Sequence, residues 1–145
     1  MLRKSTVYLT LSGLMLLFVA PFQAQAQHNA AAEKAAQDSV KPWLALIDAG
    51  KYAESWNTAS DAFKKAITKE KWAATVKPAR DPLGKVKTRK FKLSLYAKDP
   101  PNAPKGEYIT LQYDTDFAKK SGAVETLSML KDKDGKWRPG AYYIK

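Results

Sequence analysis

Residues 107–117 read EYITLQYDTDF, and their apolar side chains recur at every second position. One face of this stretch carries Ile109, Leu111, Tyr113 and Phe117. Such alternation predicts a strand with one buried face. A period of two also runs through residues 85–98, 123–131 and 136–145. The Asp134-Gly135 pair between the last two stretches is typical of a tight hairpin, so the second half of the chain predicts four antiparallel strands.

The first half of the chain has the period of a helix. Residues 29–79 are rich in Ala, Lys and Glu. Their first apolar side chains recur three to four positions apart: Ala36, Val40, Trp43 or Leu44, and Ile47. This spacing predicts an amphipathic helix, which Gly50 is expected to end. Pro42 lies within it and predicts a kink or a new start.

Three shorter helices are predicted between residues 51 and 82. Ser60 and Thr68 are typical N-cap residues for the last two of them, and Pro78 and Pro82 predict the end of the final helix. Helices followed by strands indicate an α+β fold. We predict N-terminal helices packed on one face of a curved four-stranded antiparallel sheet.

The N-terminal segment has the features of an export signal. Arg3 and Lys4 precede a short apolar stretch, and Ala24-Gln25-Ala26 matches the small-x-small pattern of a cleavage site. We predict a signal peptide at 1–26, a flexible N-terminus at 27–32 and a single domain at 33–145, exported to the periplasm of a bacterium. The apolar stretch falls short of the roughly 20 residues that a membrane span needs. We expect no membrane span after cleavage, and an uncleaved N-terminal anchor is the alternative.

Composition excludes several classes of site. The 145 residues include no cysteine, which rules out disulfides, thiolate nucleophiles, Cys-based metal sites and the lipid-bearing cysteine of lipoproteins. His28 is the single histidine and lies near one end, which argues against a Ser-His-Asp hydrolase. If signal cleavage places His28 near the N-terminus of the mature chain, it is either a disordered residue or, together with the free amine, a copper-chelating group. We predict no cofactor and no metal site in the domain.

Two charged residues fall on the predicted apolar faces of their strands. Arg89 shares a face with Phe91, Leu93 and Leu95, and Glu125 shares one with Leu127 and Met129. Val124 and Leu130 leave the buried face of the second strand open. An unpaired charge in an apolar interior is costly, so each residue is expected to be the partner of the other.

The Arg89–Glu125 pair has two interpretations. It either tethers strands as a buried ion pair or orients a polar ligand in a pocket lined by Tyr113, Trp56 or Trp72. These five residues are the candidate ligand-binding residues. No catalytic residue is assigned.

Other charged motifs have structural readings beside functional ones. Asp114 and Asp116 lie opposite the apolar face of their strand, so a solvated pair is expected, with acid–base or metal chemistry as the alternative. Residues 132–135, DKDG, have some likeness to a calcium loop but lack its downstream glutamate, so a hairpin turn is predicted. Residues 80–84, RDPLG, either shape a turn or present Arg80 at a cavity.

The chain is strongly basic, with 25 Lys and Arg against 14 Asp and Glu and a formal charge of +11. Residues 85–92, KVKTRKFK, concentrate part of that charge. An exported protein rarely meets nucleic acid, and no aromatic nucleic-acid signature accompanies the run. We expect no nucleic acid as partner and favour anionic lipid headgroups, lipopolysaccharide, acidic glycans or a small ligand. The alternative is an edge strand that lysines protect from pairing.

Six segments carry a resemblance to a known family: residues 43–56, residues 80–84 with Arg89, and residues 106–117, 123–126, 134–138 and 142–144. Together they resemble the exported bacterial family catalogued as domain of unknown function number 4019, over residues 33–145. The resemblance implies a cystatin-like, or nuclear-transport-factor-like, cone in which a curved sheet wraps helices. It brings no established activity.

Two functions of different classes remain open. The first is a non-catalytic binding or interaction module of the cell envelope. The second is a small cone-fold enzyme, isomerase-like or hydrolase-like, that uses a pocket carboxylate with an arginine. Because the predicted core contains no histidine, the commonest general base, we favour the binding module. Oligomeric state is left open.

Overall fold

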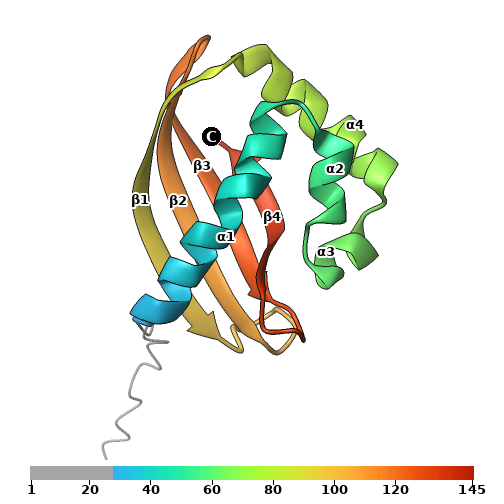
Figure 1. Ribbon diagram of the computed structural model, residues 1–145, viewed down its shortest axis with the longest axis vertical. Helices are drawn as coiled ribbons and strands as arrows, with labels where there is room; N and C mark the ends of the chain where they lie inside the picture. The colour runs from blue at the N-terminus through green and yellow to red at the C-terminus, as the bar shows by residue number, and fades with distance from the viewer. Residues whose placement is uncertain (1–27) are drawn as a thin grey trace, which may run out of the picture.

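The computed structural model describes residues 28–145, in which four α-helices lie on one face of a four-stranded antiparallel sheet (Figure 1). The α+β class and the helices-first order predicted from the sequence are confirmed. The predicted signal peptide at residues 1–26 lies outside the described residues. Within them, no helix has the length and apolar character needed to cross a membrane.

The first helix, α1 (Ala30–Asp48), crosses the sheet diagonally (Figure 1). Asn29 caps it, because its side chain accepts the N–H of Ala32 at 3.1 Å. Residues 30–32 are therefore helical, although we expected a flexible N-terminus over 27–32, and the helix extends the domain beyond the expected boundary at residue 33. Pro42 lies on the exposed side of α1, which continues through it as one helix, so no new helix starts there.

Three shorter helices complete the helical layer: α2 (Tyr52–Asn57), α3 (Asp61–Ala66) and α4 (Lys69–Arg80). The N-caps predicted at Ser60 and Thr68 are confirmed, since their side chains accept the N–H groups of Phe63 and Lys71. The chain leaves α4 between the two prolines that predicted its end. A short 3₁₀ turn, η1 (Asp81–Leu83), and Gly84 at a positive φ of 75° then lead into the sheet.

The strands are β1 (Val86–Lys98), β2 (Glu107–Phe117), β3 (Lys120–Lys131) and β4 (Trp137–Ile144), paired in the order β1-β2-β3-β4. Four strands in this antiparallel order were predicted. β3 begins earlier than the expected residue 123, because Phe117 already pairs with Lys120 across a tight turn. The sheet is open, with β1 and β4 at its edges. The cystatin-like cone implied by the resemblance stays a prediction.

An irregularity in β1 overturns one expectation about its faces. The register to β2 shifts between Phe91 and Leu93, so an extra residue lies on β1 at that point. Such a bulge exchanges the two faces of the strand beyond it. Leu95 therefore lies opposite Thr110 and is 49% exposed, whereas Tyr96 is turned to the core. The prediction that Phe91, Leu93 and Leu95 share one buried face is wrong.

The core forms where α1 meets the middle of the sheet. The helix and the strands contribute its main apolar side chains: Val40, Trp43, Leu44, Ile47, Ile109, Leu111, Leu127 and Met129. Trp43 also donates its indole N–H to the carbonyl of Ser55 at 2.9 Å, which ties α1 to α2. The predicted packing of the alternating face of β2 against α1 is thus confirmed. This core fixes the position of the charged side chains at its border.

Candidate functional site

The carboxylate of Glu125 lies at the border of this core with no exposed surface. It accepts four hydrogen bonds from side chains of β1, β2 and β4. Arg89 donates Nε at 2.7 Å and Nη2 at 3.1 Å, Thr115 donates its hydroxyl at 2.6 Å, and Tyr142 donates its phenol at 2.6 Å. The predicted pairing of Arg89 with Glu125 is therefore present in the structure.

Arg89 continues the contacts toward the helices. Its Nη1 and Nη2 atoms donate to the two carboxylate oxygens of Asp48, at the end of α1, at 2.7 and 2.9 Å. Arg80, at the end of α4, donates to the same carboxylate at 3.2 Å and to the carbonyl of Gly84 at 2.6 Å. Its guanidinium also lies 4.6 Å from the ring centre of Phe117. Arg80 is thus buried, not presented at the mouth of a cavity.

We refer to these side chains together as the interior network: Asp48, Arg80, Arg89, Thr115, Glu125 and Tyr142. Its two guanidinium groups balance its two carboxylates, so the network carries no net charge. Shared hydrogen bonds of this kind offset the cost of removing charges from water. The network joins the ends of α1 and α4 to all four strands of the sheet.

Burial and charge keep two members of the network in one protonation state. Burial raises the pKa of Tyr142, and the charge of Glu125 and the hydrogen bond to it raise that pKa further. Burial alone would lower the pKa of Arg89, but hydrogen bonds to Asp48 and Glu125 outweigh it and raise the pKa overall. Arg89 is consequently a permanent cation and Tyr142 a neutral phenol, so neither is prepared to exchange protons with a substrate.

The other predicted ligand residues do not form one pocket with the pair. Tyr113 lies directly opposite Glu125 in the β2–β3 pairing, and its ring packs edge-on against Phe91, with ring centres 6.0 Å apart. The indole of Trp72 donates to Ser55 within the helical layer at 3.0 Å. The indole of Trp56 donates to the carbonyl of Ile67 at 2.8 Å. The indole N–H groups of the two tryptophans therefore join helices to one another.

The outward carboxylates of β2 lie as their parity predicted. Asp114 pairs with Lys92 at 2.9 Å, and Asp116 accepts hydrogen bonds from the hydroxyl of Thr88 and the N–H of Gly122. Among residues 28–145, no three His, Cys, Asp or Glu side chains cluster so as to hold a metal ion. The 132–135 segment forms the predicted hairpin turn, with Gly135 at a positive φ of 79°.

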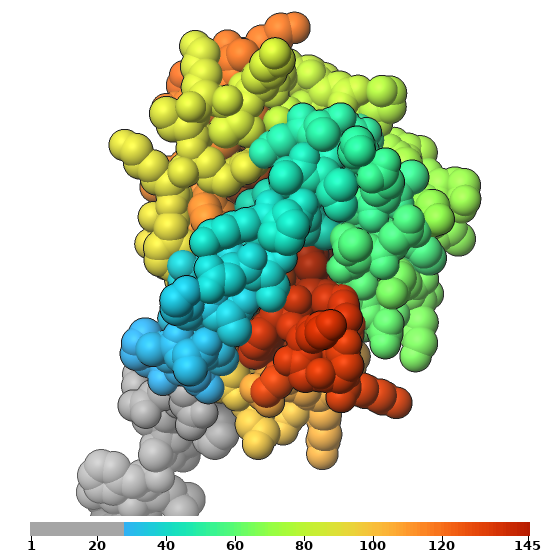
Figure 2. Space-filling view, viewed as in Figure 1, coloured from blue at the N-terminus to red at the C-terminus, as the bar shows by residue number. Residues whose placement is uncertain are grey.

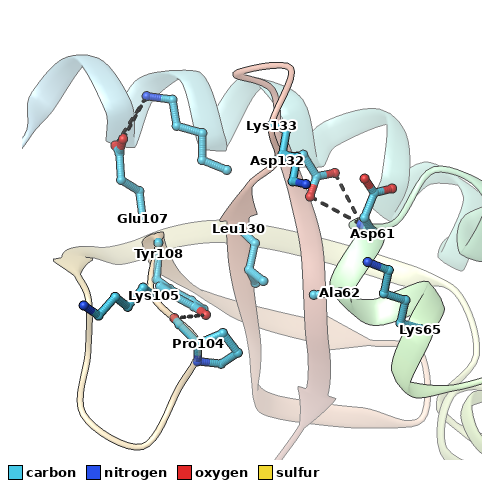
Figure 3. Close-up of a pocket in the computed structure, with 12 residues that line it drawn as sticks. Asp61, Ala62, Lys65, Pro104, Lys105, Glu107, Tyr108, Leu130, Asp132 and Lys133 are labelled. Atoms are coloured by element: carbon cyan, nitrogen blue, oxygen red, sulfur yellow. Dashed lines mark hydrogen bonds and ion pairs between the residues drawn. The ribbon is translucent and has the colours of Figure 1, made fainter.

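A cleft of about 280 Å³ opens at the lower end of the sheet, between α3, the β1–β2 loop and the β3–β4 turn (Figure 3). We call it the loop-end cleft. Leu130, Tyr108, Pro104 and Ala62 supply its less polar lining. Lys65, Lys105 and Lys133 supply cationic side chains from three different segments. Sequence reasoning missed this cleft, because its lining residues come from loops that no periodicity brings together.

A second basic feature lies at the opposite end of the sheet. Backbone hydrogen bonds from Ala118 to Lys85 at 2.8 Å and from Lys119 to Leu83 at 2.9 Å hold the β2–β3 turn beside the start of β1. We call the exposed lysines brought together there the basic end: Lys85, Lys87, Lys119 and Lys120. None of the four has an ion-pair partner among residues 28–145. Side chains of β1 and of this turn project together at the top of Figure 2.

Comparison with known proteins places the chain in a family. No curated protein matches the sequence. The model of a family of proteins of unknown function, DUF4019, matches residues 39–142. This match covers most of the chain, from the middle of α1 into β4. The chain therefore belongs to the DUF4019 family.

Proposed function

We propose that this protein is exported to the periplasm of a bacterium and there acts as a non-catalytic module that binds an anionic lipid surface through its basic end. The observation that carries the proposal is the convergence of Lys85, Lys87, Lys119 and Lys120 without ion-pair partners in the described chain. Lysines near an anionic membrane surface each contribute about 1 kcal/mol of attraction. The export part of the proposal rests on the signal-like residues 1–26.

The balance of charge over the domain supports this proposal. Arg3 and Lys4 lie outside the described residues, which leaves 23 basic against 14 acidic residues and a formal charge of +9. The interior network contributes nothing to that excess, because its charges cancel. The excess is therefore carried by surface lysines, which suits attraction to polyanionic surfaces.

The enzyme alternative finds less support in the geometry. Glu125 has no exposed surface and already accepts four hydrogen bonds. In the loop-end cleft, Glu107 pairs with Lys131 at 3.1 Å and Asp132 pairs with Arg138 at 2.9 Å. A general base needs a free lone pair within reach of a substrate proton, and these carboxylates are engaged in other contacts.

Export is tested by fractionating cells that express the full chain and measuring the intact mass of the periplasmic form. The proposal expects a chain that starts at or near Gln27. A periplasmic or membrane-bound form whose mass includes residues 1–26 would contradict cleavage. Recovery only from the cytoplasm would contradict export.

Lipid binding is tested by co-sedimentation of the exported form with vesicles. Vesicles that contain phosphatidylglycerol are expected to retain the protein, and retention should fall as salt rises, because salt screens exposed charges over roughly 10 Å at 0.1 M. The decisive variant, the basic-end triple variant, carries Lys85→Gln, Lys87→Gln and Lys119→Gln. Its affinity should fall by about tenfold or more, given about 1 kcal/mol per lysine. Equal retention on pure phosphatidylcholine vesicles would contradict the proposal.

A further inference from the structure

We propose that the loop-end cleft is a binding site for a phosphomonoester carried on a small, partly apolar body. The site lies at the end of the sheet opposite the basic end, and it does not depend on the proposed attachment to lipid. Its size sets the scale of the ligand. A cleft of about 280 Å³ lies just below the usual range for small-molecule sites and accommodates a body of about one ring.

The cleft is held open by contacts within its own walls. In the β1–β2 loop, the N–H of Gly106 donates to the carboxylate of Asp99 at 2.7 Å, and the phenol of Tyr108 donates to the carbonyl of Pro104 at 2.7 Å. On the opposite wall, the carboxylate of Asp132 accepts the N–H of Asp61 at 3.3 Å. Walls fixed before binding lower the entropic cost of taking up a ligand.

The acidic side chains of the lining are already matched by cations. Lys131 pairs with Glu107, and Arg138 pairs with Asp132. Lys64 lies 3.4 Å from Asp61. Arg138 is shared with Asp134, so one negative charge of this group is not cancelled. Against it stand three further lysines of the lining that have no ion-pair partner in residues 28–145: Lys65, Lys105 and Lys133. The cleft therefore presents a local excess of positive charge.

The number of lysines favours a doubly charged phosphate over a singly charged carboxylate. A guanidinium fork suits both groups, and the guanidinium nearest the cleft, Arg138, is engaged by Asp132 and Asp134. The three lysines offer compact point charges, which suit a phosphate group with close to two negative charges at neutral pH. Figure 3 shows Lys65 and Lys105 on opposite sides of the cleft with Leu130 between them. A ligand with its body on Leu130 would direct its phosphate toward one of these lysines, and the side chain of Lys105 would have to turn inward to contact it.

Phenyl phosphate is the probe that combines one ring with one phosphomonoester. Titration into the ¹⁵N-labelled exported form should shift the amide signals of Ala62, Gly106 and Lys133, and phenol should not. Benzoate, with the same ring and a single charge, should bind at least about tenfold more weakly, because hydrogen bonds to charged groups are strong and depend on the number of charges. Benzoate binding as tight as phenyl phosphate would overturn the assignment of phosphate.

Two charge-matched variants locate the binding. The cleft triple variant carries Lys65→Gln, Lys105→Gln and Lys133→Gln, and its Kd for phenyl phosphate should rise by about tenfold or more. The basic-end triple variant removes the same charge at the other end of the sheet and should bind the probe as the parent does. Equal weakening in both variants would show that the probe follows net charge only, and the proposed site would be wrong.

A third variant tests the cleft without a change of charge. Ala62 is exposed on α3 and lines the cleft, so Ala62→Trp should fill the space, abolish the amide shifts and leave the thermal melting temperature close to that of the parent. Unchanged shifts in this variant would overturn the site.

Binding to vesicles that contain phosphatidate is measured in parallel. If the cleft triple variant loses more phosphatidate binding than the basic-end triple variant, the phosphate belongs to a lipid headgroup. If the basic-end triple variant loses more phosphatidate binding but still binds phenyl phosphate, the phosphate belongs to a soluble molecule.

Discussion

The interior network and the loop-end cleft both concentrate charged side chains, but the charges are paired in the network and partly unpaired in the cleft. In the network, two arginines and two carboxylates cancel, and Glu125 has no exposed surface. In the cleft, three lysines keep their charge toward solvent. The difference separates two tasks. Paired charges in the interior hold helices to the sheet, whereas unpaired charges at the surface are available to a partner.

The largest expected effect comes from breaking the network. Arg89→Met removes two hydrogen bonds from the buried carboxylate of Glu125, and loss of one partner of a buried pair costs about 3–5 kcal/mol of unfolding free energy. Adding Glu125→Gln removes the unmatched charge, so the double variant should be more stable than Arg89→Met alone. Guanidinium chloride unfolding at neutral pH measures the unfolding free energy of the parent, both single variants and the double variant.

A neighbouring lysine on β1 is the matched control for this comparison. Lys90 is exposed, so Lys90→Met should change stability by less than about 0.5 kcal/mol. Small and additive effects of Arg89→Met and Glu125→Gln would contradict the account, because they would show that the two side chains are not coupled.

The second effect compares two leucines on the two faces of the sheet. Leu111 is fully buried on β2, and Leu111→Ala should cost about 2–5 kcal/mol. Leu95 lies beyond the β1 bulge and is 49% exposed, so Leu95→Ala should cost less than about 1 kcal/mol. Denaturant unfolding of both variants decides the point. A loss at Leu95 as large as at Leu111 would mean that β1 keeps a single buried face.

The third effect is a loss of stability in alkali. Burial, together with the hydrogen bond to Asp81 and its charge, raises the pKa of Tyr52 to about 12, and burial beside Glu125 raises that of Tyr142. In an unfolded chain, tyrosine has a pKa of about 10. Above that pH the unfolded chain releases protons that the folded chain retains, so these tyrosines cease to favour folding as pH rises toward 12 and beyond.

Unfolding midpoints measured from about pH 8 to pH 12 should therefore be level up to about pH 10 and then fall, because tyrosine titrates there in the unfolded chain. Tyr52→Phe should make that fall shallower, since phenylalanine has no proton to release. Tyr108, whose phenol is bonded to a loop carbonyl, provides a control in Tyr108→Phe. Identical alkaline slopes in the parent and in Tyr52→Phe would contradict the assignment.

The smallest effect is expected from the surface lysines. The cleft triple variant removes three charges that stabilise no ion pair in the described chain, so its unfolding free energy should stay within about 0.5 kcal/mol of the parent. Thermal melting followed by circular dichroism is sufficient to measure it. A marked loss of stability would mean that these lysines have a structural task, and the contrast with the network would disappear.

Much of the fold followed from local rules. Ser60 and Thr68 cap helices as their types predicted, and three of the four strands both begin and end within one residue of the expected bounds. Arg89 and Glu125 were paired correctly because each lies on the core face of its strand. The exposure of Leu95 was not predictable, since a bulge changes parity without a mark in the hydrophobic pattern.

The rest of the candidate site depends on tertiary structure. Asp48 and Arg80 end two different helices, and only the packing of α1 and α4 on the sheet brings them to Arg89. The loop-end cleft joins residues from α3, a loop and a turn. No spacing in the sequence links such segments, so their meeting had no local signal. Side chains within a regular stretch of strand were predictable, because parity decides their face where no bulge intervenes.

The measurement that tests the separation of tasks most directly is vesicle and phenyl phosphate binding by the Arg89→Met/Glu125→Gln double variant. The variant should remain folded with reduced stability, and both affinities should stay within about twofold of the parent, because neither binding site shares a side chain with the network and sites without shared partners act independently to within about 0.5 kcal/mol. A folded double variant that has lost either affinity would contradict the account and would make the interior network part of the binding site.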